Sequence, residues 1–257
     1  MTGLANHLAA AGRGGRKLLV PYVMAGIPEP AQFEEAARAV GEHADALEIG
    51  IPYSDPLMDG PVIAAAAARS IATGVGPSAA LDLVGALDRG PPRVVMTYYN
   101  PVHRIGEDVF CARLARANVA GIIVPDLPVE EADELTDAAA RNDLAWIPLV
   151  SPTSSPERAE RIARTATGFV YAVSTLGVTG TREELSRRAA SVAEACREGA
   201  RVPVLVGIGI STPEQARAAV AHADGVVIGS AVVERIIEQG VDRAGKFLAE
   251  VRAALDS

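Results

Sequence analysis

The sequence predicts an α/β fold: a single-domain (β/α)8 TIM barrel that spans residues 1–257 and carries a short extra helix at its N-terminus. Eight short apolar runs alternate with longer amphipathic stretches rich in Ala, Glu and Arg, as repeated strand–helix units do. Most of these runs are nearly continuous in apolar residues, which is typical of parallel strands buried on both faces. No linker or change of composition divides the chain, so a closed barrel fits better than an open doubly wound sheet.

The strands are expected, in chain order, at residues 18–24, 46–51, 93–97, 121–124, 145–150, 169–173, 204–206 and 225–228. A helix signal follows each strand. The tetrapeptide Thr212-Pro213-Glu214-Gln215 combines an N-cap, a proline at the first helical position and a capping-box glutamine. The segment Ser154-Ser155-Pro156-Glu157 has nearly the same pattern.

The charge balance excludes two classes of partner. The chain has 24 Lys and Arg against 32 Asp and Glu, a formal net charge of -8, and no basic run. Nucleic acids and anionic membrane surfaces both need clustered cations, so neither is an expected partner.

The cysteines and the first residues indicate a compartment. Cys111 and Cys196 lie far apart in stretches predicted to be helical, and no CxxC pair occurs, which favours a reducing environment. Residues 1–20 contain only short apolar runs interrupted by Arg and Lys. We therefore expect neither a signal peptide nor a spanning helix there, and the cytoplasm is the default location.

Glu48 is the first candidate catalytic residue. Strand alternation places Leu47, Ile49 and Ile51 on one face and Glu48 on the other, so Glu48 points into the barrel lumen if the apolar face meets the helices. A desolvated carboxyl has a raised pKa, which suits a general acid/base near neutral pH. The alternative is a buried glutamate paired with an Arg or Lys of another strand, and we find no basic residue inside the other strand cores.

The segment 52–61 after this strand brings two more acids, Asp55 and Asp59, and three prolines to the rim where a barrel keeps its active site. Asp59 is a candidate site residue. An Asp before Gly-Pro is equally a good turn residue and helix N-cap, and its position alone does not decide between the two.

The last two strands end in glycine-rich loops. Residues 207–211 follow the seventh strand, and Gly229-Ser230 follows the eighth and opens a helix. Exposed backbone amides and a helix N-terminus favour an anion, so the pair of loops predicts phosphate binding over plain turn chemistry. A nucleotide site is less favoured, because Thr212 stands at the third glycine of GxGxxG.

Two further features are less specific. Residues 174–180, after the sixth strand, fit a lid over the site and an ordinary loop equally well. The four histidines are scattered without ligand spacing, so no metal site is expected.

The run from Leu47 to Pro61, LEIGIPYSDPLMDGP, resembles the signature of the tryptophan synthase alpha subunit family. Further blocks of the family follow in the same order and cover most of residues 18–233: PYV with AG at 21–26, MTYYNP at 96–101, PDLP at 125–128, GVTG at 177–180 and GSA at 229–231. An ordered set of this kind is highly specific.

The resemblance implies a barrel that cleaves indole-3-glycerol phosphate to indole and glyceraldehyde 3-phosphate, a retro-aldol reaction with no cofactor in this chain. Glu48 would be the general acid/base, protonating indole C3 and accepting the proton of the glycerol hydroxyl. Asp59 would hold the indole N–H and stabilise the positive charge that develops there. Tyr171 matches a family tyrosine near the catalytic glutamate.

The resemblance also implies binding positions. Phosphate would be bound by backbone groups at Gly180, Gly209, Gly229 and Ser230, and Asp55 and Thr179 would couple two mobile loops over the closed site. The indole slot would be lined by Tyr22, Met96, Tyr98, Ile123 and Ile208.

The sequence departs from the family at four places. Ile27 stands where an Asp is familiar, Pro125 where an Ala is, and Ile208 where a Phe is, and the pair Thr175-Leu176 replaces an Arg-containing pair. None of these departures removes a catalytic group.

A partner follows from the same resemblance: a separate beta subunit that uses pyridoxal phosphate to join indole to serine in an alpha2-beta2 heterotetramer. The alternatives are a stand-alone indole-3-glycerol-phosphate lyase, a silent barrel that only activates the beta subunit, and another phosphate-binding barrel such as a sugar-phosphate isomerase. The presence of both Glu48 and Asp59 speaks against a silent barrel, and the SDPLMDGP block does not favour an isomerase.

Overall fold

One curled sheet of parallel strands forms the centre of the computed structural model, which describes residues 2–173, 182–207 and 209–257. Along the sheet the strand order is β5-β4-β3-β2-β1-β9-β8-β7-β6. The strands are β1 (Leu18–Met24), β2 (Leu47–Gly50), β3 (Arg93–Met96), β4 (Val119–Ile123), β5 (Ala145–Trp146), β6 (Leu149–Val150), β7 (Val170–Val173), β8 (Val204–Gly207) and β9 (Gly225–Ile228).

The sheet closes into a barrel through the segment predicted as one strand at 145–150. That segment is two short strands, β5 and β6, separated by Ile147 and Pro148, because a proline has no amide to give to the ladder. Hydrogen bonds continue across the break: the Ile147 amide donates to the Ile122 carbonyl, and the Tyr171 amide donates to the Pro148 carbonyl. The predicted (β/α)8 barrel is therefore confirmed, with its fifth strand interrupted.

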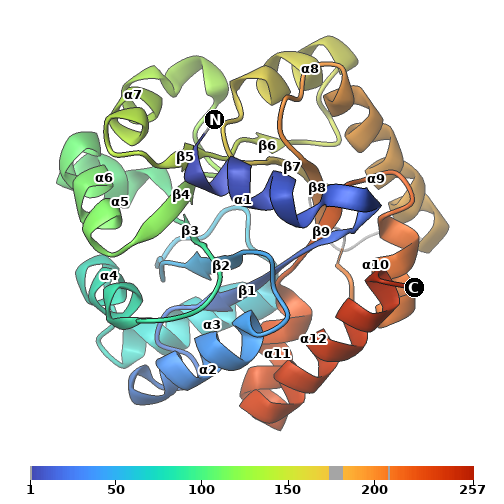
Figure 1. Ribbon diagram of the computed structural model, residues 1–257. Helices are drawn as coiled ribbons and strands as arrows, with labels where there is room; N and C mark the ends of the chain where they lie inside the picture. The colour runs from blue at the N-terminus through green and yellow to red at the C-terminus, as the bar shows by residue number, and fades with distance from the viewer. Residues whose placement is uncertain (1, 174–181, 208) are drawn as a thin grey trace.

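The helices surround the sheet as a ring, with α1 set apart at one end (Figure 1). Three units hold two helices where one was expected; at two of these junctions Gly106 and Gly240 adopt φ of 89°, a conformation that ends one helix and starts the next. The helices are α1 (Gly3–Ala11), α2 (Phe33–Gly41), α3 (Pro61–Ala72), α4 (Pro77–Ala86), α5 (Tyr99–Ile105), α6 (Glu107–Arg116), α7 (Asp133–Arg141), α8 (Pro156–Thr165), α9 (Arg182–Arg197), α10 (Pro213–Ala219), α11 (Ser230–Gln239) and α12 (Val241–Leu255), with short 3-10 turns at Arg13–Gly15, Pro30–Gln32 and Val129–Glu131.

The predicted helix starts are confirmed at α8 and α10. The Thr212 side chain accepts from the Gln215 amide, and the Gln215 side chain accepts from the Thr212 amide, which completes a capping box. At α8 the Ser155 hydroxyl accepts from the amide of Arg158. These caps fix where the chain leaves the barrel mouth and turns into a helix.

Two hydrophobic layers hold the barrel together. The larger one lies between the sheet and the helices and takes the outward side chains of the strands, such as Leu47 and Ile49. The smaller one fills the lumen with side chains such as Ala46, Val94 and Ile123. The lumen is therefore a packed core in its lower part and not a pore.

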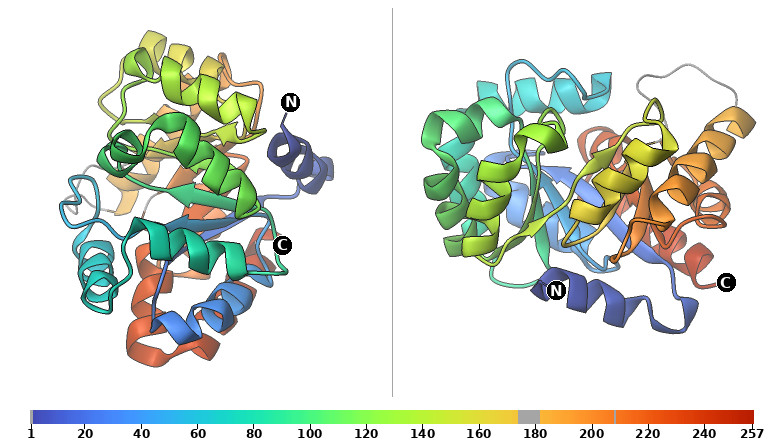
Figure 2. Two further views of the ribbon diagram at one scale, coloured as in Figure 1. Left: turned by 90° about the vertical axis from the view of Figure 1, so that its left-hand side faces the viewer. Right: turned by 90° about the horizontal axis from the view of Figure 1, so that it is seen from above.

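The N-terminal helix α1 closes the lower end of the lumen, as the right-hand view of Figure 2 shows. Leu4 and Leu8 belong to the lumen cluster and are almost fully buried. Leu4 fits against two glycines: a Cβ at Gly168 or Gly121 would lie 3.0 or 3.1 Å from its methyl group. The expected extra helix is confirmed, and it leaves the opposite end of the barrel for the site.

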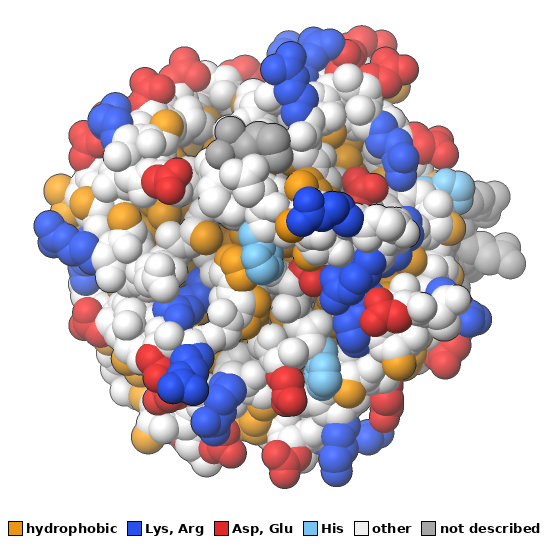
Figure 3. All heavy atoms as spheres, in the orientation of Figure 1, with side chains coloured by type: hydrophobic (Ala, Val, Ile, Leu, Met, Phe, Trp, Pro, Cys, Tyr) orange, Lys and Arg blue, Asp and Glu red, His pale blue; other side chains and the backbone are white. Residues whose placement is uncertain are grey.

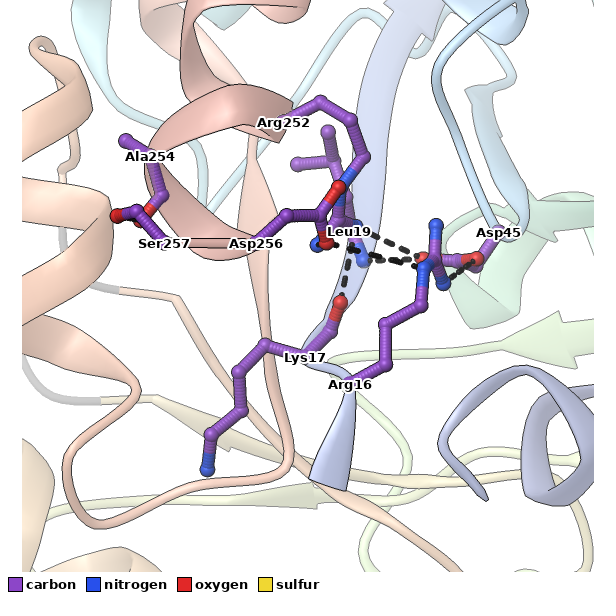
Figure 4. Close-up of polar contacts among 8 residues, drawn as sticks. All are labelled: Arg16, Lys17, Leu19, Asp45, Arg252, Ala254, Asp256 and Ser257. Carbon is purple, nitrogen blue, oxygen red and sulfur yellow. Dashed lines mark hydrogen bonds and ion pairs between the residues drawn. The ribbon is translucent and has the colours of Figure 1, made fainter. Parts of the chain in front are cut away.

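A buried charge network joins the chain ends beneath the barrel (Figure 4). Asp45 is 6% exposed, forms an ion pair with Arg16 at 2.5 Å and accepts a hydrogen bond from the Leu19 amide at 2.8 Å. Arg252, on α12, donates to the Lys17 carbonyl at 2.9 Å and lies 3.4 Å from Asp45. The network ties α12 to the start of β1 and to the segment before β2.

Charged side chains of both signs are interspersed over the face drawn in Figure 3. Within the described ranges, no helix is long and apolar enough to cross a membrane.

Candidate active site

Glu48 lies in the lumen, as the alternation of its strand predicts. Its neighbours in register are Tyr22 on β1 and Val94 on β3, and the residue is 2% exposed. Its Oε2 atom is buried without a hydrogen-bond partner. Burial, and secondarily the charge of Asp59, raise the pKa of Glu48 from 4.5 to about 8. Glu48 is therefore mostly protonated at neutral pH.

A structural ion pair does not account for Glu48. Arg93, at the first residue of β3, is the one buried cation on a described strand. Its guanidinium donates to the carbonyls of Val84 and Ala117, at 3.3 and 3.5 Å, in the helical layer. In the described part of the chain Glu48 has no ion-pair partner, so the buried salt-bridge alternative is wrong.

Asp59 lies in the loop between β2 and α3, close enough for its charge to act on Glu48. Its alternative as a helix cap is wrong: the N-cap of α3 is Gly60, and no side chain caps the helix there. Burial raises the pKa of Asp59 from 3.8 to about 6, while a hydrogen bond with Tyr98 opposes that shift by stabilising the carboxylate. Asp59 is therefore mostly charged at neutral pH.

Three tyrosines surround the two carboxyl groups. Tyr22 is 4% and Tyr98 is 3% exposed, and Tyr171 is partly buried among the lumen residues. Burial raises the pKa of Tyr22 and of Tyr171 well above the usual value, with the charges of Glu48 and Asp59 adding to the effect. All three phenols stay protonated, and the Tyr22 hydroxyl donates to Met24 Sδ at 3.8 Å.

The other expected pocket residues that the structure describes, Met96 and Ile123, lie on β3 and β4 in the lumen cluster that Tyr171 also contacts. Ile123 is fully buried and Met96 partly so. The barrel therefore brings together the predicted acid/base, the second carboxyl and most of the predicted apolar slot. Asp55, in the same loop as Asp59, is exposed, and its carboxylate accepts from the Ser54 hydroxyl.

The two predicted phosphate loops end neighbouring strands, β8 and β9. Gly229 is the N-cap of α11, and Ser230 is its exposed first residue, so the first amides of a ten-residue helix open toward the mouth. Gly209 has φ of 62° and is exposed, with open space where a side chain would be. The remaining predicted residues Thr179, Gly180 and Ile208 lie outside the described residues.

Sequence reasoning missed the contacts that hold the loop of Asp59. The Tyr98 hydroxyl accepts from the Met58 amide at 3.0 Å, and the Asn100 side chain donates to the Tyr53 hydroxyl at 3.0 Å. No local pattern announces these contacts, because they join segments 40 or more residues apart. Among the described residues, no group of three or more His, Cys, Asp or Glu is placed to hold a metal ion.

A closed barrel with two carboxyl groups of raised pKa at its mouth, at the same end as two glycine-bearing strand ends, is the arrangement of an acid–base barrel enzyme. The family model described as "Tryptophan synthase alpha chain" matches residues 8–255. This chain belongs to the tryptophan synthase alpha chain family, whose members are lyases that cleave indole-3-glycerol phosphate.

Individual relatives agree over nearly the whole length. The tryptophan synthase alpha chain of Synechococcus sp. strain CC9902 is 42% identical over 255 residues, which is 95% of this chain and 94% of the relative. That of Geobacillus stearothermophilus is 47% identical over 228 residues, which is 87% of this chain and 84% of the relative.

Two solved structures also superpose closely. Tryptophan synthase subunit alpha from Legionella pneumophila has a TM-score of 0.89 at 33% identity, covering 100% of this chain and 99% of the other. A structure of Mycobacterium tuberculosis tryptophan synthase has a TM-score of 0.91 at 38% identity, covering 99% of this chain and 98% of the other.

Proposed function

We propose that Glu48 and Asp59 carry out the cleavage of indole-3-glycerol phosphate to indole and glyceraldehyde 3-phosphate at the mouth of this barrel. The observation that carries the proposal is the placement of Glu48, which is 2% exposed in the lumen, has an Oε2 atom without a partner and interacts with the charge of Asp59. Burial raises the pKa of Glu48 to about 8 and that of Asp59 to about 6. Between these values one carboxyl holds a proton to give and the other holds a negative charge. Neighbouring carboxyl groups pushed apart in this way mark an acid and an electrostatic stabiliser.

The proton balance needs only Glu48. Its carboxylic acid gives a proton to C3 of the indole ring, which leaves the ring cationic and Glu48 ionised. The carboxylate then takes the proton of the glycerol hydroxyl on the carbon bonded to C3. As that oxygen becomes an aldehyde, the C–C bond breaks, its electron pair returns to the ring, and indole leaves. Glu48 ends protonated, as it began.

Asp59 acts on the ring nitrogen. Protonation at C3 makes the indole N–H positively charged, and the Asp59 carboxylate accepts its hydrogen bond in a site that is shielded from water. The interaction is stronger in the cationic intermediate than in the bound substrate, and this difference is what accelerates a reaction. The hydrogen bond from Tyr98 keeps Asp59 ionised for this role.

We further propose the position of the substrate. Gly209, Gly229 and Ser230, with Gly180 as inherited from the family resemblance, bind the phosphate through backbone groups. The N-terminus of α11 supports this, because its open amides and dipole favour an anion. The indole ring lies among Tyr22, Met96 and Ile123, with Tyr98 and Tyr171 at its edge, and Ile208 completes the slot.

A beta subunit is the proposed partner, in an alpha2-beta2 complex in which pyridoxal phosphate belongs to the beta chain. Leu57 and Met58, in the loop that also carries Asp59, are 83% and 42% exposed, so the mouth presents apolar side chains to solvent. A partner that covers the mouth would bury them and receive indole directly. The proposed compartment is the cytoplasm, which fits the two buried free cysteines.

Indole release from indole-3-glycerol phosphate tests the proposal. The purified chain is assayed alone and with a beta subunit from the same source. Slow release alone with strong activation by the partner is the expected result. Fast release that the partner does not change would identify a stand-alone lyase, and no release under either condition would overturn the proposed reaction.

A further inference from the structure

A chain of contacts runs from the first turn of α5 to the loop of Asp59 through Tyr53, which lies outside the proposed substrate slot, and Tyr98, which lies at the edge of that slot. The Asn100 side-chain amide donates to the Tyr53 hydroxyl at 3.0 Å. The Tyr53 ring is stacked on the Tyr98 ring, with centroids 5.1 Å apart and planes inclined by 26°. The geometry is the offset stacking that aromatic pairs prefer.

Tyr98 also contacts the loop that carries Asp59. Its hydroxyl accepts from the Met58 amide at 3.0 Å. Met58 is the residue directly before Asp59, so this hydrogen bond fixes the backbone that carries the Asp59 carboxyl. The Tyr98 hydroxyl also acts to lower the pKa of Asp59, so the position of the Tyr98 ring influences both the place and the charge of that carboxyl.

The other end of the chain of contacts is anchored. The amide of Tyr99, at the first residue of α5, donates to Asp126 Oδ1 at 2.9 Å, so an acid from the loop after β4 fixes this end of the helix. Asn100 is the next residue. Three successive loops of the barrel mouth thus meet at one turn of helix, and Tyr53 is the link to the β2–α3 loop.

We propose that Tyr53 and Asn100 are positioning residues for the cleavage reaction: they hold Tyr98 against the Met58 backbone of the β2–α3 loop and thereby hold the neighbouring Asp59 in its indole-binding position. Neither side chain touches the reacting atoms. The inference rests on the proposed role of Asp59. It assigns a function to the Tyr53 hydroxyl, which the proposed reaction itself does not use.

Asp59 is also influenced by other groups, and these stay unchanged in the variants below. Glu48 on β2, Tyr22 on β1 and Tyr171 on β7 all interact electrostatically with it. Among the groups in the described ranges that shift the pKa of Asp59, Tyr98 is the one that lowers it. Loss of the Tyr98 contact therefore moves the pKa of Asp59 upward, whereas a disturbance elsewhere in the loop has no fixed sign.

The test uses four single variants of the full chain, together with the double variant Tyr53→Phe/Asn100→Leu. Tyr53→Leu removes the stack and the hydroxyl, Tyr53→Phe keeps the stack, and Asn100→Leu removes the donor. The control is Tyr99→Phe, which deletes a neighbouring tyrosine hydroxyl that donates to Glu107 at 2.7 Å and not toward Asp59. Carbon-13 NMR of aspartate-labelled protein gives the pKa of Asp59, with its signal assigned by Asp59→Asn. Indole release gives kcat and KM.

Tyr53→Leu should raise the pKa of Asp59 and lower kcat by about tenfold, with little change in KM, since a stacked pair contributes up to about one power of ten. Tyr53→Phe and Asn100→Leu should each have a smaller effect of the same sign, and the double variant should equal either single one, because both remove the same bond. Tyr99→Phe should change neither quantity.

An unchanged pKa of Asp59 in a folded Tyr53→Leu chain would overturn the inference, and so would an equal shift in Tyr99→Phe. The NMR measurement does not need turnover. Failure of the wild-type chain to release indole would refute the proposed reaction. An unchanged pKa of Asp59 in the Tyr53→Leu variant of an active enzyme would refute only the positioning role.

Discussion

The hydroxyl of Tyr22 occupies the space that a side chain at Gly50 would take: a Cβ on residue 50 would lie 1.8 Å from it. Tyr22 pairs in register with Glu48, and Gly50 is two residues nearer the barrel mouth. The missing side chain lets the tyrosine ring lie beside the Glu48 carboxyl, the proposed acid/base. The same relation recurs between β7 and β8, where a Cβ at Gly207 would lie 2.6 Å from the Tyr171 ring.

Gly50→Ala should therefore disturb the site through Tyr22. The added methyl forces the ring or the strand to move, and overpacking of this kind costs about 1–3 kcal/mol of stability. A displaced ring beside Glu48 should also lower kcat/KM by at least about tenfold. Thermal unfolding and indole release measure the two effects. Gly3→Ala is the control, since a Cβ there has open space. If the two variants had equal stability and equal kcat/KM, the steric relationship between Gly50 and Tyr22 would be refuted.

Sequence alone predicts part of this arrangement. A strand has a period of two, so Glu48 and Gly50 were placed on one face of β2, and the lumen position of Glu48 is confirmed. The ring of Tyr22 over Gly50 depends on the register between β1 and β2. Register is set by the packing of the whole barrel, and no local pattern carries it.

Glu48→Gln should lower kcat by about 10²–10⁴-fold, the usual loss when a general acid/base is removed. The amide keeps the shape of the side chain but cannot pass a proton. Glu107→Gln is a matched control, because Glu107 is also a buried glutamate, 8% exposed, and its hydrogen bond goes to Tyr99 on the outer helices. The control should keep near-normal turnover. A Glu48→Gln enzyme that also does so would remove Glu48 from the mechanism.

Glu48 should also make stability depend on pH. Its pKa is about 8 in the folded chain and near 4.5 when exposed, so between these values the folded state binds the extra proton. Stability from this group is fully present below pH 4.5 and is lost as pH rises to about 8, by on the order of 4 kcal/mol. In urea unfolding, the free energy of unfolding of Glu48→Gln should rise relative to that of the wild type between pH 5 and pH 9. A difference that does not vary with pH would contradict the raised pKa.

Asp59→Asn should reduce kcat much more than it raises KM, because the negative charge matters most when the indole is cationic. In the wild type, activity should fall below about pH 6 as Asp59 takes up a proton. That acidic limb should be absent from the variant's residual activity. Rate measurements from pH 5 to 8 check both points; a loss confined to KM would contradict the role.

The rest of the site shows where sequence patterns end. Asp59 before Gly-Pro fitted a helix cap and a site residue equally well, and the structure excludes the cap because Gly60 is the N-cap of α3 and no side chain caps that helix. The hydrogen bond of Asn100 to Tyr53 joins residues 47 apart in the chain. Such contacts exist only once the barrel has brought neighbouring strand ends together.

The network beneath the barrel should stabilise the fold without affecting the site. Asp45→Asn removes the carboxylate that pairs with Arg16 at 2.5 Å and with Arg252 at 3.4 Å. Because Arg252 keeps its pair with Asp256 at 2.5 Å, the cost should be about 2 kcal/mol, as for a lost hydrogen bond to a charged group. The matched control is Glu250→Gln in the exposed pair with Arg243, at 3.9 Å, which should change stability by less than about 1 kcal/mol. Urea unfolding measures both.

Because Asp45 precedes β2, at the end of the strand opposite the mouth, kcat of the folded Asp45→Asn enzyme should equal that of the wild type. Combining Asp45→Asn with Arg252→Met should cost less than the sum of the single changes, since both remove one interaction; strict additivity would show that the two residues act independently.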